Sequence, residues 1–128
     1  PAAATDRLLK AIRHPLVQII GHPTGRLIGH RDGLEPDMET LCAAAAEHGT
    51  ALEINANWQR LDLRDTHVRL ALEKGCDIAI NCDTHRPHDA DNLRFGVTTG
   101  ARGGLTSDRC VNAWSADKLR SWLKAKRG

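Results

Sequence analysis

The chain has 128 residues, of which 41% are hydrophobic and 27% charged, with a formal net charge of +2 and a sequence isoelectric point of about 8.6. This balance is typical of a single soluble globular domain spanning residues 1–128, and so small a basic excess does not by itself indicate a nucleic-acid partner. No apolar run approaches the roughly 20 residues of a membrane span, and Asp6, Arg7 and Lys10 interrupt the segment where a signal peptide would be apolar.

Three apolar segments alternate with two segments of helical periodicity. We expect strands at 16–22, 51–57 and 77–85, and helices at 37–49 and 64–75. Asp37 is a suitable N-cap for the first helix, while Gly49 and Gly75 are suitable ends for the two helices. The alternation predicts an α/β fold with about three parallel strands joined by crossover helices.

The C-terminal part predicts two further helices, over 107–114 and 115–127, with Ser107 and Ser115 as N-caps. An apolar stripe in the second of these helices favours core packing over a binding face (Leu119, Trp122 and Leu123). The basic residues from Lys118 onward fit a solvated helix end or a tail that contacts phosphate. The four cysteines form no CxxC pair, which favours reduced, mostly buried thiols and a cytoplasmic location.

Each expected strand becomes polar on one face toward its C-terminal end, where ligands bind in parallel sheets. The residues that share a face are Gln18, Ile20 and His22 in the first strand, Glu53, Asn55 and Asn57 in the second, and Asn81, Asp83 and His85 in the third. His22, Asp83 and His85 are thus expected to converge at one edge. Two imidazoles and a carboxylate suit zinc, manganese or iron.

Each of these residues also has an ordinary structural interpretation. Asp83 can cap the segment that follows it, and His85 can be a surface residue before a proline. Arg26 and Arg60 follow strand ends, where each can hold a phosphate or stay solvated.

The segments IIGHPTGRL, ALEINANWQRLDL, INCDTH and NLRFGV, in this order, resemble the PHP (polymerase and histidinol phosphatase) domain, and most of all the C-terminal PHP domain of bacterial family X DNA polymerases. The resemblance runs from about residue 14 to about residue 122. It implies a distorted β/α barrel with a metal cluster at the carboxyl ends of the strands. The implied activity is hydrolysis of phosphoesters, here as a 3′-5′ exonuclease that processes DNA ends in repair.

The resemblance also assigns roles to residues. The histidine of GHP is His22, and the aspartate and histidine of the D-x-H motif are Asp83 and His85; all three are implied metal ligands, with Asp83 catalytic as well. Glu53, Asn55 and Asn57 are implied to line the interior near the site. We expect Arg26, Asn57 and Arg60 to contact the substrate phosphate.

The family's early H-x-H motif and its later histidine and glutamate ligands are absent, since the first 14 residues contain only His14. We therefore expect the C-terminal portion of a PHP-like barrel, with an incomplete metal cluster and weak or no activity alone, associated as a homo-oligomer that closes the barrel. A non-catalytic structural or oligomerisation module is the alternative. A phosphatase of small molecules such as histidinol phosphate is a further one, although EINAN and RLDL argue against it. The sequence does not reveal the metal, the number of ions or the natural substrate.

Overall fold

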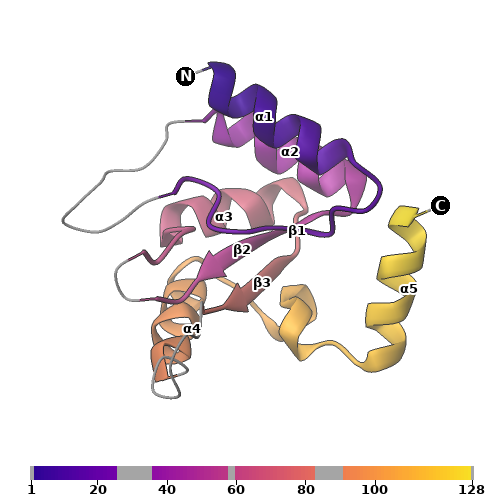
Figure 1. Cartoon of the computed structure of the whole chain (residues 1–128). Coiled ribbons are helices and arrows are strands. Elements are labelled where there is room, and N and C mark those ends of the chain that lie inside the picture. Colours follow the sequence, from indigo (N-terminus) through magenta and orange to yellow (C-terminus); the bar gives the residue numbers. More distant parts are fainter. Residues whose placement is uncertain (1, 26–35, 58–59, 83–90, 128) are drawn as a thin grey trace.

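The computed structural model describes residues 2–25, 36–57, 60–82 and 91–127. For residues 2 and 127 it describes the backbone and not the side chain. Within these ranges the chain forms three strands, five α-helices and two short 3₁₀ helices (Figure 1). In chain order they are α1 (Ala2–Arg13), β1 (Ile19–Ile20), α2 (Met38–His48), β2 (Ala51–Asn55), α3 (Asp65–Lys74), β3 (Ile78–Asn81), α4 (Leu93–Arg102), η2 (Ser107–Arg109), η3 (Val111–Ala113) and α5 (Ala116–Arg127).

The three strands form one open parallel sheet in the order β1-β2-β3. Ile19 pairs with Ala51, and Asn55 pairs with Asn81, so the carboxyl ends of the strands lie at one edge. The expected α/β alternation with parallel strands is confirmed. An assignment to a PHP-type barrel does not follow from these strands alone, because the described sheet is not closed.

All three strands are shorter than the expected segments, β1 most of all. The Val17 N–H donates to the His14 carbonyl at 3.1 Å, so a turn delays the start of β1. At the other end His22 has a left-handed φ of 25°, which no strand residue adopts. The prediction that Gln18, Ile20 and His22 share one strand face is therefore wrong for His22. Residues 83–85 of the third expected strand lie outside the described residues.

The two crossover helices end where the sequence predicts. The Asp37 carboxylate accepts the Thr40 N–H at 3.1 Å as the N-cap of α2. Gly49 and Gly75 follow α2 and α3 with φ of 68° and 95°, a left-handed conformation in which glycine is the least strained residue.

The expected helix over 107–114 is wrong, because the chain there forms η2 and η3 around an extended Cys110. Cys110 makes a parallel bridge with Ile78 and so continues the sheet beyond β3 for one residue. Thr106, and not Ser107, takes the N-cap position of η2. Ser115 does cap α5, since its hydroxyl accepts the Lys118 N–H at 3.1 Å.

Two helices were not expected from the sequence, and both cover the core. α1 packs on α2 with Ile12 fully buried, and α4 packs on β2 and β3. The central core side chains come from the sheet face that carries Ile20, Leu52, Ile54, Ile78 and Ile80. None of the helices in the described ranges is long and apolar enough to cross a lipid bilayer.

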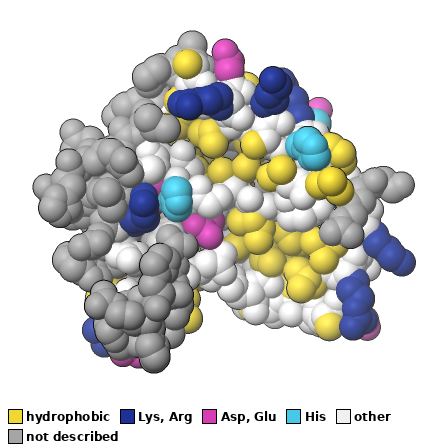
Figure 2. Space-filling view, viewed as in Figure 1, with side chains coloured by type: hydrophobic (Ala, Val, Ile, Leu, Met, Phe, Trp, Pro, Cys, Tyr) yellow, Lys and Arg dark blue, Asp and Glu magenta, His cyan; other side chains and the backbone are white. Residues whose placement is uncertain are grey.

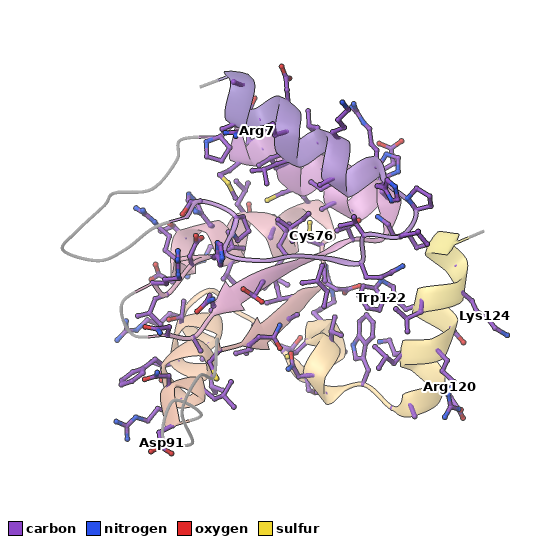
Figure 3. The ribbon with its side chains drawn as sticks, viewed as in Figure 1. Arg7, Cys76, Asp91, Arg120, Trp122 and Lys124 are labelled. Carbon is purple, nitrogen blue, oxygen red and sulfur yellow. The ribbon has the colours of Figure 1, made fainter. Side chains whose placement is uncertain are left out.

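The C-terminal helix α5 is held to the rest of the structure by hydrogen bonds from two of its side chains. Trp122 points toward the body and Arg120 and Lys124 point away from it (Figure 3). The Trp122 indole N–H donates to the Gly49 carbonyl at 2.8 Å, and the Lys126 ammonium donates to the Ile12 carbonyl at 2.7 Å. Burial lowers the pKa of Lys126. The basic end of this helix is thus partly docked. Leu119, Trp122 and Leu123 are half-buried, and none of them belongs to the hydrophobic core of the described residues, so the expected core packing of this stripe is not confirmed.

The contact between α4 and the sheet requires a glycine, and this yields a prediction. A Cβ at Gly96 would lie 2.6 Å from the Ile80 Cγ2 and 2.7 Å from the Ala56 Cβ. Overpacking of this severity costs roughly 3 kcal/mol, while the better helix propensity of alanine returns about 1 kcal/mol. We expect Gly96→Ala to lower the free energy of unfolding by about 2 kcal/mol in urea titrations.

The neighbouring residue Val97 is 58% exposed on the same helix and provides the control. Val97→Ala is expected to change the free energy of unfolding by less than about 0.5 kcal/mol. Equal effects of the two substitutions would contradict the close packing of α4 on the sheet.

Candidate functional site

The carboxyl edge of the sheet carries a polar cluster that joins all three strands. One oxygen of the half-buried Glu53 carboxylate accepts the backbone N–H of His22 at 3.0 Å. The other oxygen accepts the side-chain amide N–H of Asn81 at 3.1 Å. His22 follows β1, Glu53 lies in β2 and Asn81 ends β3, so one carboxylate links the ends of three strands.

The register of the sheet explains why these groups meet. Glu53 pairs with Ala79 and Asn55 pairs with Asn81, so Glu53 and Asn81 project from the same face, opposite the apolar core face. The chain after β1 passes close to this carboxylate, since a Cβ at Gly21 would lie in ordinary van der Waals contact with it, at 3.6 Å. Figure 2 shows histidine, acidic and basic side chains next to one another in this part of the surface, beside a broad hydrophobic area.

The turn that contains His22 is held in place by a hydrogen bond to a buried acid. The Gly25 N–H donates to the His22 carbonyl at 2.9 Å, which closes the turn. The buried Thr24 N–H donates to the Asp62 carboxylate at 3.0 Å, and Asp62 is 1% exposed. Asp62 in turn pairs with Asn55 in an antiparallel bridge beside β2. The turn is therefore held to the sheet on two sides.

The segment after β2 places Asn57 and Arg60 at the same edge. The Asn57 N–H donates to the Asn55 side-chain oxygen at 3.1 Å, and the Arg60 N–H donates to the Asn57 carbonyl at 2.8 Å. Both side chains are half-buried. This turn keeps the Arg60 backbone close to the end of β2, where a bound anion would lie if the edge is a binding site.

The predicted site residues fall into two groups. His22, Asn57 and Arg60 are described, and all three lie at the carboxyl edge of the sheet. Arg26, Asp83 and His85 lie outside the described residues. Asn81 ends β3 two positions before Asp83, so β3 leads into the D-x-H motif from this edge.

Of the three expected metal ligands, only His22 lies within the described residues. The described ranges contain no group of three His, Cys, Asp or Glu side chains able to hold a metal ion. The exposed His22 imidazole is a suitable nitrogen donor, and a carboxylate and a second imidazole would have to come from Asp83 and His85. The chemistry of these three side chains fits zinc, manganese or iron.

Sequence reasoning missed two features of this edge. Glu53 was placed near the site, but its bonds to His22 and Asn81 depend on the end of β1, which the sequence did not predict. Asp62 was not singled out, although it is a buried acid that holds the turn after His22. An acid flanked by two leucines in RLDL, directly after a strand, is the signal that could have revealed it.

The fold and the cluster define an α/β protein that gathers polar groups at the carboxyl edge of a parallel sheet. A curated protein from Bacillus subtilis (strain 168), named DNA polymerase/3′-5′ exonuclease PolX, is 42% identical to the chain over 118 residues. The match includes 92% of this chain but only 21% of that protein, so the chain spans about a fifth of the relative's length. No family model matches the chain.

The anchoring of the turn gives a second prediction. Asp62→Ala removes the acceptor of the buried Thr24 N–H, and an unpaired buried donor costs about 1–3 kcal/mol. We expect a loss of that size in the free energy of unfolding, measured by chemical denaturation. Asp117→Ala is the control, because its carboxylate is 95% exposed and pairs with the exposed Arg120. A variant at Asp62 as stable as the control would show that the turn does not depend on this carboxylate.

Proposed function

We propose that this chain contributes part of the active site of a metal-dependent phosphoesterase, in a protein related to family X DNA polymerases that removes nucleotides from DNA 3′ ends. The identity to a protein named polymerase and 3′-5′ exonuclease supports the proposal. The observation that carries it is the link that Glu53 makes between the ends of β1 and β3. This link brings His22 to the edge from which the chain continues to Asp83 and His85.

In this proposal His22, Asp83 and His85 hold a divalent ion such as zinc, manganese or iron. When bound, such an ion supplies hydroxide near neutral pH and polarises a phosphoryl oxygen. Asn57 and Arg60 face the substrate from the turn after β2. Arg26, which lies outside the described residues, is proposed as a further phosphate contact. An arginine pairs with phosphate through two parallel hydrogen bonds, which orients the phosphate for attack.

The ligand set in this chain is smaller than the metal cluster of the PHP domain that the sequence resembles. We infer that the three strands belong to a larger β/α barrel of that type, and that the chain alone hydrolyses DNA slowly or not at all. A second copy that closes the barrel is one way to complete the site. The proposed enzyme acts on DNA 3′ ends in the cytoplasm as part of repair.

A non-catalytic oligomerisation module is the second candidate, and one observation favours it. β1 is an edge strand of the described sheet. Ile19, within it, is 37% exposed, and Leu16, which precedes it, is 67% exposed. An open edge with apolar neighbours is a surface on which another strand can pair. This candidate predicts self-association without bound metal.

Metal content separates the two candidates. We expect the untagged chain to retain zinc, manganese or iron near one equivalent by elemental mass spectrometry, and His22→Ala and Asp83→Ala to lose it. His48→Ala is the control. His48 ends α2 three residues before β2 begins, so it lies at the amino end of the sheet and not at the carboxyl edge. With metal present, we expect little release of nucleotide from a 3′-labelled single strand.

Absence of metal from the unmodified chain, together with self-association, would contradict the enzymatic proposal and favour the oligomerisation module. Rapid metal-dependent release of nucleotide, lost in Asp83→Ala, would instead contradict the inference that the ligand set is too small for activity.

A further inference from the structure

We propose that Glu53 is a positioning residue for the metal ligands, because its carboxylate fixes the backbone of His22 and the end of β3 at the same time. The inference rests on the proposed function, since it assigns Glu53 a role toward the ion held by His22, Asp83 and His85. It concerns a side chain outside that ligand set.

The bond to His22 fixes the direction in which the imidazole leaves the chain. His22 has a φ of 25°, in the left-handed region that L-residues rarely adopt, and it is not a glycine. Its N–H donates to the Glu53 carboxylate at 3.0 Å, and its carbonyl accepts the Gly25 N–H at 2.9 Å. Both peptide groups of His22 are thus engaged, so the uncommon conformation is held from both sides.

The bond to Asn81 fixes the end of β3, the last described strand before Asp83 and His85 in the sequence. Asn81 is the last residue of β3, and only Cys82 separates it from Asp83. Its amide N–H donates to the second Glu53 oxygen at 3.1 Å. Because both bonds end on one carboxylate, the end of β1 and the end of β3 cannot separate without breaking one of them.

The partners of Glu53 distinguish a positioning role from direct coordination. Each carboxylate oxygen already accepts one hydrogen bond from the protein, as is usual for a group that orients ligands. Glutamine keeps an oxygen for the His22 N–H, and Asn81 can turn its own amide oxygen toward the glutamine N–H₂. Glu53→Gln therefore preserves the geometry but removes the charge that a ligand would need.

The test uses the whole chain and two readouts. The first is hydrogen exchange of the His22 amide by NMR without metal; the second is zinc and manganese affinity by titration calorimetry. The variants are Glu53→Ala, Glu53→Gln and, as control, Glu47→Ala, which alters an exposed acid on α2. Circular dichroism verifies that each variant is folded.

We expect the His22 amide to be protected in the unmodified chain, in Glu53→Gln and in Glu47→Ala, and to exchange freely in Glu53→Ala. Metal affinity should fall about 10- to 100-fold in Glu53→Ala and far less in Glu53→Gln. Unchanged protection and affinity in Glu53→Ala would overturn the proposal. Equal loss of affinity in both Glu53 variants would overturn it in favour of direct coordination.

The two readouts separate this inference from the proposed function. If the unmodified chain binds neither metal, the proposed function fails and the positioning role toward a metal fails with it. If the chain binds metal but the His22 amide exchanges freely, the proposed function stands and the role of Glu53 is overturned.

Discussion

A single carboxylate, that of Glu53, holds the carboxyl edge of this sheet together. It accepts one hydrogen bond from the end of β1 and one from the end of β3. Hydrogen bonds to a charged group contribute about 1.5–3 kcal/mol each when shielded from water, and somewhat less at a half-buried position such as this. β1 pairs with β2 over only two residues, so a bond beyond its end matters more than it would for a longer strand.

The core and the polar edge depend on opposite faces of the same strands. Leu52 and Ile54 point into the core, while Glu53 between them points to the polar face. A shift of β2 by one residue relative to its neighbours would bury Glu53 and expose the apolar side chains, so hydrophobic burial fixes the position of the carboxylate. Asp62 adds a second attachment, because it binds the turn after His22 from the segment that follows β2.

Much of the fold could be predicted because it depends on local chemistry. Asp37, Gly49 and Gly75 fix the ends of α2 and α3, and each acts as its residue type predicts. α1 was missed although Ala4, Leu8 and Ile12 recur at helical spacing, because no N-cap residue marks its start. The segment around Cys110 was misjudged because its pairing with Ile78 is a long-range contact that overrides helical periodicity.

The candidate site was predictable in outline and not in detail. Alternation along β2 and β3 correctly places Glu53 and Asn81 on a polar face at the carboxyl edge. Alternation failed for His22, because the backbone leaves the strand at Gly21 and adopts a left-handed conformation. Its contact with Glu53 is made by the backbone, and a pattern of side chains carries no information about such a bond.

The most direct test of the account is anomalous X-ray diffraction from crystals grown with manganese or zinc. The account predicts an anomalous peak about 2.0–2.2 Å from an imidazole nitrogen of His22, with Asp83 and His85 completing the coordination and Glu53 bonded to the His22 N–H. A peak bound elsewhere on the chain, or none at this edge, would contradict the assignment of a metal site to the carboxyl ends of β1 and β3.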